Sequence, residues 1–137
     1  MKKLYILLLI ALPAFGYGQK KPARIVFDVT SKDPETHQAV LRHVSGMAKA
    51  YPDATFEVVV YGGALPLVVK EESSSAGTVE ELALKKNVSF KVCAQTMQRD
   101  GVDQSQLITG VQVVPDGIME IVMKQADGWG YIKESHN

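Results

Sequence analysis

The sequence has very little cysteine, since Cys93 is the single one among its 137 residues. An intramolecular disulfide is therefore excluded, and so is the CxxC motif of thiol–disulfide oxidoreductases. A redox role would need a resolving cysteine from another chain. Cys93 itself either reacts, as a free thiol or in a link to another chain, or is a buried and inert small side chain, as many unpaired cysteines are.

Histidine is also scarce, with three residues in the chain. His37 and His43 lie six positions apart and so do not share a helix face, and His136 is next to the C-terminal residue. No spacing of histidine, cysteine and carboxylate resembles a metal site, and the phosphate-binding patterns GxGxxG and GxxxxGK are absent. We therefore expect no metal and no other cofactor.

The chain shows no excess of charge of either sign, because 15 basic residues balance 15 acidic ones. Nucleic-acid-binding domains carry a basic patch or stripe that neutralises phosphates. No such stripe is seen, and we expect no nucleic-acid partner.

Long apolar runs are absent apart from one near the N-terminus, Leu4–Leu12, which two lysines precede. It is shorter than the roughly 20 residues that span a membrane and matches the apolar region of a secretory signal. Gly16 and Gly18 are small enough for a signal-peptidase site. We predict a signal peptide at residues 1–18, a single mature domain at residues 19–137, no membrane association after cleavage, and a periplasmic or secreted location.

Strand and helix patterns alternate along the mature chain. Short runs rich in β-branched and aromatic residues predict strands, and apolar residues at helical spacing predict helices. The predicted strands are 24–30, 55–61, 88–92, 111–114 and 131–133, and the main predicted helices are 34–51, 78–86, 94–99 and 118–127. Asp33 is expected to cap the first helix, and Thr78 with Glu81 to form a capping box.

This alternation predicts right-handed βαβ crossovers and an α/β fold. We expect three α/β/α layers around a mostly parallel sheet of about five strands, whose order the pattern does not reveal. The strands read as apolar on both faces, as in a sheet that helices cover on both sides. Met97, Met119 and Met123 are expected in the core.

Ligands of an open parallel sheet bind beyond the carboxyl ends of its strands. Residues at these ends are the first site candidates: Thr30, Ser31, Tyr61, Gly62, Gly63, Cys93, Ala94, Gln95, Thr96, Pro115, Asp116 and Gly117. Cys93 is the strong nucleophile among them, and a strand-to-helix junction favours its thiolate through the free N–H groups of the helix. If the side chain points into the sheet instead, it is core and unreactive. Asp28 is a candidate buried acid, although such a residue more often bonds a local backbone amide.

Extended stretches of the chain resemble the DsrE/DsrF-like family. The likeness is carried by Val88–Met97, by Gly101 and Val102, by Leu107–Gly117, by Glu120, Gln125, Gly128, Tyr131 and Ile132, and upstream by Val58–Leu65 with its Gly62–Gly63 pair. It covers nearly the whole mature chain and rests on this extended pattern, because no short signature defines the family.

The resemblance implies a three-layer fold on a parallel sheet and a homo-oligomer, a trimer or hexamer. It also implies that a cysteine at the position of Cys93 carries sulfur as a persulfide and passes it between protein partners. The sequence hypothesis is thus a sulfur carrier or sulfurtransferase-like protein outside the cytoplasm, with Cys93 as its catalytic residue. The alternative is a non-catalytic binding or assembly module of the same fold, in which the cysteine is structural.

Overall fold

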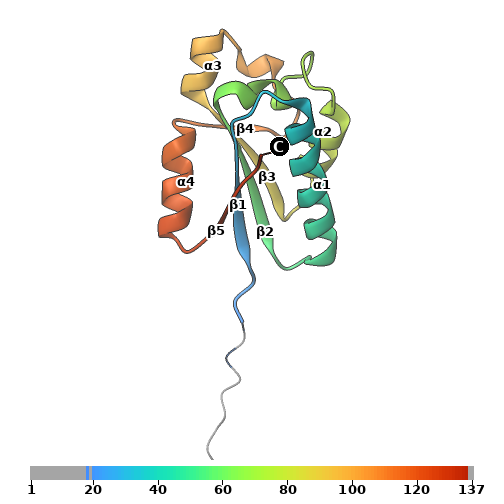
Figure 1. Cartoon of the computed structure of the whole chain (residues 1–137), viewed down its shortest axis with the longest axis vertical. Coiled ribbons are helices and arrows are strands. Elements are labelled where there is room, and N and C mark those ends of the chain that lie inside the picture. Colours follow the sequence, from blue (N-terminus) through green and yellow to red (C-terminus); the bar gives the residue numbers. More distant parts are fainter. Residues whose placement is uncertain (1–17, 19, 136–137) are drawn as a thin grey trace, which may run out of the picture.

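The computed structural model describes residue 18 and residues 20–135. The predicted signal peptide, except for its last residue Gly18, therefore lies outside the described residues, and so does His136. Within them, five parallel strands form one sheet in the order β4-β3-β2-β1-β5 (Figure 1). The strands are β1 (Arg24–Val29), β2 (Thr55–Val60), β3 (Val88–Cys93), β4 (Gln112–Val114) and β5 (Gly130–Lys133). The predicted α/β fold is confirmed.

Four α-helices and two short 3-10 helices connect the strands within the described part of the chain. They are α1 (Pro34–Ala50), η1 (Gly62–Val68), α2 (Ala76–Ala83), α3 (Ala94–Asp100), η2 (Gln104–Gln106) and α4 (Gly117–Ala126). Asp33 caps α1 as predicted, because its Oδ1 accepts the amide of Glu35 at 3.0 Å.

The predicted capping box of Thr78 and Glu81 is wrong. The helix α2 begins earlier, at Ala76, and its N-cap Ser75 makes no side-chain capping bond. The amide of Ser75 donates to Ser73 Oγ at 3.2 Å, which forms a local turn before the helix. The chain thus enters the helix before Thr78, which lies inside it and not at its end.

The strand order explains the three layers. From β1 to β4 the chain moves across the sheet in one direction, and the β4–β5 connection returns to the far side of β1. Because parallel crossovers are right-handed, a reversal of direction places the connecting helix on the opposite face. Figure 1 shows this arrangement: α1 and α2 lie on one side of the sheet and α4 on the other.

The two faces of the sheet are packed unequally. The face toward α1 and α2 holds the larger core, in which Phe56, Val58 and Phe90 are almost completely buried. The face toward α4 holds a small cluster of Val26, Val59 and Ile121. Tyr61 and Trp129, both partly buried, pack against that small cluster.

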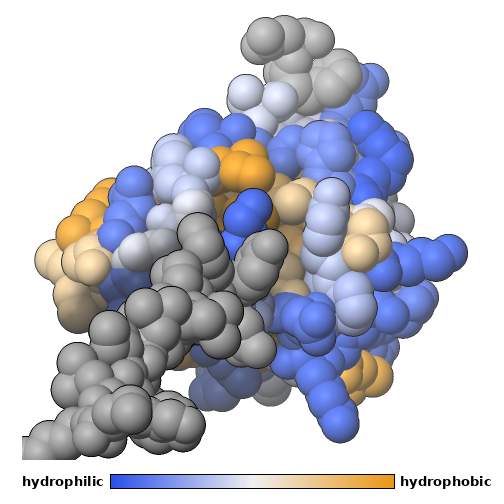
Figure 2. Space-filling model, turned by 90° about the horizontal axis from the view of Figure 1, so that it is seen from below, coloured by the Kyte–Doolittle hydropathy of each residue, from blue (hydrophilic) through white to orange (hydrophobic). Residues whose placement is uncertain are grey.

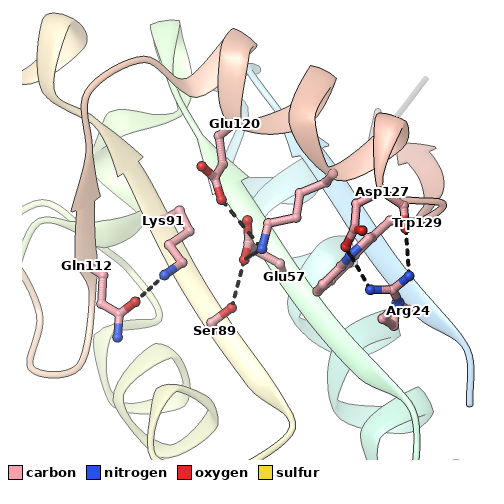
Figure 3. A network of polar contacts seen from close by, with 9 residues as sticks. Arg24, Glu57, Ser89, Lys91, Gln112, Glu120, Asp127 and Trp129 are labelled. Atoms are coloured by element: carbon pink, nitrogen blue, oxygen red, sulfur yellow. Dashed lines mark hydrogen bonds and ion pairs between the residues drawn. The ribbon is translucent and has the colours of Figure 1, made fainter.

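The expectation that the strands are apolar on both faces is wrong for the face toward α4. Glu57 of β2 and Ser89 and Lys91 of β3 point to this side, as Figure 3 shows. A helix is about 10 Å wide, whereas strands are spaced about 4.8 Å apart, so one helix cannot cover five strands. Ser89 and Lys91 have polar partners on the neighbouring strands, whereas Glu57 lies under the helix itself and pairs with its Lys124.

Met97 lies in the core as expected, but Met119 and Met123 do not, since they are 54% and 60% exposed. The helix α4 meets the sheet through a narrow stripe that includes Gly117 and Ile121, the two residues of the helix that are buried. The remaining apolar side chains of α4 therefore face outward.

Candidate functional site

Cys93 is the last residue of β3 and the N-cap of α3, at the carboxyl edge of the sheet. It pairs in register with Val114, the last residue of β4. The connection after β3 packs its Leu107 and Ile108 into the larger core, whereas the connection after β4 runs through α4 on the other face. Cys93 thus stands where neighbouring crossovers leave the sheet on opposite sides, which is the usual ligand position in such folds.

Gly117, the first residue of α4, lies directly against Cys93. A Cβ added to Gly117 would come within 3.2 Å of the Cys93 Cβ and 3.3 Å of the Tyr61 side chain. The absence of a side chain therefore allows this close approach. It brings the free backbone N–H at the positive end of α4 to the cysteine sulfur.

Thr96 supports the thiol from the other side. Its hydroxyl oxygen accepts the amide of Gly62 at 3.1 Å, which ties the start of η1 to α3. The hydroxyl and the backbone amide of Thr96, and the backbone amide of Gln95, also lie near the Cys93 sulfur, and each lowers the pKa of the thiol. The side chain of Gln95 donates to Asp116 Oδ2 at 3.2 Å, across the gap between α3 and α4.

These donors decide the acidity of Cys93, which is 6% exposed. Burial by itself would raise the pKa of the thiol, because it penalises the thiolate. The N–H of Gly117, followed by the amide and hydroxyl of Thr96 and the amide of Gln95, outweighs burial and leaves the pKa of Cys93 below its ordinary value. The result is a nearly enclosed cysteine with stabilised thiolate, the property that nucleophilic cysteines share.

A second polar cluster lies on neighbouring strands of the same edge. Asp28 of β1 is buried and accepts the hydroxyl of Tyr131 at 2.6 Å and the Lys133 ammonium at 3.2 Å. Burial, and then the charge of Asp28, raises the pKa of Tyr61 to about 12, and the hydrogen bond to Asp28 does the same for Tyr131. Both phenols are therefore neutral hydrogen-bond donors at physiological pH, and Asp28 fastens β5 to β1.

Of the residues predicted at the strand ends, the structure brings Tyr61, Gly62, Cys93, Thr96 and Gly117 together around the sulfur. The amide of Gln95 also faces the sulfur, whereas Thr30 and Ser31 have different partners. Thr30 accepts a hydrogen bond from Lys133 at 2.6 Å, and the Ser31 carbonyl meets His37 Nε2 at 2.7 Å.

His37 and His43, the two histidines among the described residues, have separate partners. His37 meets the Ser31 carbonyl, and His43 Nδ1 lies 3.0 Å from Glu134 Oε1. No three His, Cys, Asp or Glu side chains gather in a metal-binding arrangement within residues 20–135. No helix in that part of the chain is both long and apolar enough to cross a bilayer.

Sequence reasoning placed Gly117 at a strand end but missed its role as the hydrogen-bond donor to Cys93. It also missed the hydroxyl of Thr96, although it expected the free amides at the start of the helix after Cys93 to favour the thiolate. The signal for Gly117 is the Asp-Gly pair that follows β4: Asp116 caps α4 by accepting the amides of Ile118 at 2.9 Å and Met119 at 3.1 Å. What the pattern could not show is that this capped end meets β3.

The model of the DsrE/DsrF-like family matches residues 24–133. The search among curated proteins found no match.

Several solved structures are similar to this chain, including the following three. A protein of unknown function, MTH1491 of Methanobacterium thermoautotrophicum, is 30% identical over 81% of this chain and 98% of its own, with a TM-score of 0.75. The ychN protein of E. coli is 15% identical, with coverages of 82% and 98% and a TM-score of 0.68. The protein of unknown function BT1422 of Bacteroides thetaiotaomicron is 13% identical, with coverages of 80% and 93% and a TM-score of 0.66. The last two show the fold alone.

We predict that Gly117→Ala raises the pKa of Cys93. The added methyl group has to push the start of α4 away from Cys93 and Tyr61, which weakens the N–H bond to the thiolate. The loss of about 1 kcal/mol from such a bond slows alkylation at neutral pH by roughly three- to tenfold. The measurement is the rate of iodoacetamide labelling against pH, in which the midpoint reports acidity and the high-pH plateau reports access.

Gly77→Ala serves as the matched control, because a Cβ at Gly77 meets no atom within 4 Å. Its labelling profile should coincide with that of the unaltered protein. An unchanged midpoint in Gly117→Ala would show that the Gly117 amide does not set the acidity of the thiol.

Proposed function

This chain belongs to the DsrE/DsrF-like family, and on that premise we propose that it is a sulfur carrier that holds a persulfide on Cys93. The family is linked to sulfur relay. The observation that carries the proposal is the close approach of Gly117, at the start of α4, to a cysteine at the carboxyl edge of the sheet, where N–H and O–H groups lower the pKa of the thiol. A sulfur carrier needs a thiolate in a site that limits contact with water, and Cys93 combines both features.

The proposed reaction is an exchange at sulfane sulfur. The Cys93 thiolate attacks the outer sulfur of a donor persulfide, R–S–SH, and forms a new bond from Sγ to that sulfur. The donor S–S bond breaks, and its electron pair leaves with the donor as the thiolate R–S⁻. The product is Cys93–S–SH, and no external oxidant or reductant is consumed. Attack by an acceptor thiolate on the outer sulfur reverses these roles and restores the Cys93 thiolate.

The alternative function, a binding or assembly module with a structural cysteine, is favoured by the low exposure of Cys93. It predicts slow labelling of the native protein at every pH. The carrier proposal predicts labelling and sulfur loading at pH values below those at which an ordinary thiol, of pKa about 8.5, reacts.

We predict that incubation with a sulfane-sulfur donor adds the mass of one sulfur atom to the intact protein, and that Cys93→Ser abolishes the gain. Intact-mass spectrometry measures both. Since the pKa of Cys93 is lowered, loading should remain appreciable as the pH falls toward neutrality, whereas loading of a free cysteine derivative in the same solution declines. No gain of mass, or a gain that persists in Cys93→Ser, refutes the proposal.

We further propose that the carrier works in the periplasm or outside the cell, after removal of residues 1–18. The support is the sequence pattern of a short basic start, an apolar run and small residues at Gly16 and Gly18. In that location its sulfur donor and acceptor are exported proteins.

We predict that the protein recovered from the periplasm or the culture medium begins at Gln19. N-terminal sequencing of that protein tests the prediction. A chain that retains residues 1–18 and stays with the cytoplasmic fraction contradicts it.

We also propose that the protein acts as a homo-oligomer, a trimer or hexamer, with α4 at the subunit contact. Four apolar side chains of α4 face outward: Ile118, Met119, Val122 and Met123, with exposures of 48–60%. In Figure 2, apolar side chains lie at the margin on the side where Figure 1 places α4. A grouped apolar surface of this kind is typical of a protein–protein contact, and a second copy of the chain is the partner that the family resemblance implies.

We predict that Val122→Glu converts the oligomer to monomers, because it places a charge in the centre of this apolar stripe. Size-exclusion chromatography with light scattering measures the change. Leu84→Glu is the control, since Leu84 is 71% exposed and follows α2 on the other side of the sheet. The proposal fails if the unaltered protein is monomeric or if Val122→Glu keeps its assembly.

A further inference from the structure

A buried ion pair joins α4 to the centre of the sheet. Glu57 of β2 is 2% exposed, and its Oε2 lies 2.9 Å from Lys124 Nζ and accepts the Ser89 hydroxyl at 3.3 Å. Lys124 also approaches Glu120 Oε1 at 3.6 Å. Glu57 Oε1 has no hydrogen-bond partner among the described residues. Figure 3 shows Glu57 rising from β2 toward the underside of α4, where Glu120 lies above it.

This pair adds a polar contact to the apolar contact between α4 and the sheet. The apolar part of the contact is small, because Ile121 is the residue of α4 that packs with Val26 and Val59. The ammonium of Lys124 also lies 4.4 Å from the centre of the Trp129 ring, and the Arg24 guanidinium lies 5.5 Å from it. One lysine thus connects the helix to a carboxylate below it and to an aromatic ring beside it.

The pair and the site lie on one face of the same helix. Gly117, Ile121 and Lys124 are spaced by four and then three residues, which places them above one another on an α-helix. At about 1.5 Å per residue, Lys124 lies roughly 10 Å along the axis from Gly117. An anchor at Lys124 therefore fixes the rotation of α4 and the direction in which its first amide points.

We propose that Glu57 and Lys124 are positioning residues, which hold α4 so that the Gly117 amide meets the sulfur of Cys93. Neither residue is among the groups that contact the sulfur, and both act through the placement of the helix. The inference rests on the proposed function for its biological meaning, since it names what tunes the carrier thiol. Its physical content concerns the acidity of Cys93 alone.

Direct electrostatics and positioning predict different changes in the pKa of Cys93 when Glu57 or Lys124 is replaced. If charge acted through space, loss of the Glu57 carboxylate would favour the thiolate, and loss of the Lys124 ammonium would disfavour it. If the pair positions the helix, loss of either partner releases the anchor and disfavours the thiolate. The separation of roughly 10 Å, about one Debye length at 0.1 M salt, also weakens the direct effect.

The experiment compares Glu57→Gln, Lys124→Met and the double variant Glu57→Gln/Lys124→Met. The readout is the midpoint of the rate of Cys93 alkylation by iodoacetamide against pH, in the full-length protein. We expect both single variants to move the midpoint upward and to slow labelling at neutral pH by roughly three- to tenfold, as for a weakened hydrogen bond to the thiolate. The midpoint shift of the double variant should equal that of one single variant and not the sum of the two single shifts. Either substitution alone already removes the contact that anchors α4.

Glu134→Gln is the matched control. Glu134 is also a buried carboxylate with a basic side chain as its partner, but that partner is His43 of α1, on the side of the sheet away from α4. Its loss removes a comparable charge and leaves α4 in place, so the midpoint should not move. Lys124→Arg is the conservative variant, which retains a cation for Glu57 and should keep the midpoint close to that of the unaltered protein.

Shifts of opposite sign in the two single variants, or unchanged midpoints in folded protein, would overturn the proposal. If a single variant does not fold because it leaves a buried group unpaired, the double variant decides the matter. It removes both members of the buried pair, and the carboxylate that loses Lys124, Glu120, is in part exposed to water. A double variant with the original midpoint then refutes positioning. Alkylation requires no sulfur donor, so this test can fail while sulfur loading of Cys93 succeeds, and the reverse.

Discussion

The contact between the first residue of α4 and the last residue of β3 is the feature on which the chemistry of this structure depends. It follows from chain direction: the strands run from β1 to β4 across the sheet, and the return to β5 moves the last helix to the other face. The helix begins directly after β4, beside the end of β3, and the missing side chain of Gly117 allows an approach so close that an added Cβ would lie 3.2 Å from the Cys93 Cβ. The strand order thus places the backbone N–H of Gly117 near the sulfur of Cys93.

The face of the sheet that α4 covers offers this helix only a small apolar contact. The apolar cluster under α4 has three buried residues, in contrast to the extensive core on the side of α1 and α2. The Glu57–Lys124 pair adds to this contact at the cost of dehydrating a carboxylate. Burial accordingly raises the pKa of Glu57, with Lys124 opposing and Glu120 reinforcing the rise. Removing one partner of a buried pair typically costs about 3–5 kcal/mol, whereas the intact pair adds little net stability. In this structure the pair matters for the placement of α4, because an ion pair between two specific atoms is more directional than a few apolar contacts.

Much of this fold follows from local pattern, and the exceptions have a common cause. Strands, the Asp33 cap and the location of Cys93 at a strand end depend on neighbours in sequence, and they were predictable. The exposure of Met119 and the burial of Glu57 depend on which part of α4 faces the sheet, which is a contact between distant segments. The hydrogen bond from Gly117 to Cys93 is of the same kind. Single-sequence reasoning found the nucleophile and the amides of the helix that follows it, but not the Gly117 donor, because strand order was needed to bring β3 and α4 together.

The surroundings of Cys93 also bear on whether it is a structural side chain. An inert buried cysteine lies among apolar groups, and burial then keeps the thiol protonated. Burial also raises the pKa of Cys93, yet donors from Gly117, Thr96 and Gln95 lower that pKa by more, so it lies below its ordinary value. The amides of Gln95 and Thr96 face any residue that caps α3, but the Gly117 amide comes from a different helix, and a core that merely needed a small apolar residue would gain nothing from it. The alternative of a structural cysteine accounts for the low exposure of Cys93 and leaves these donors unexplained, whereas a thiolate carrier accounts for both.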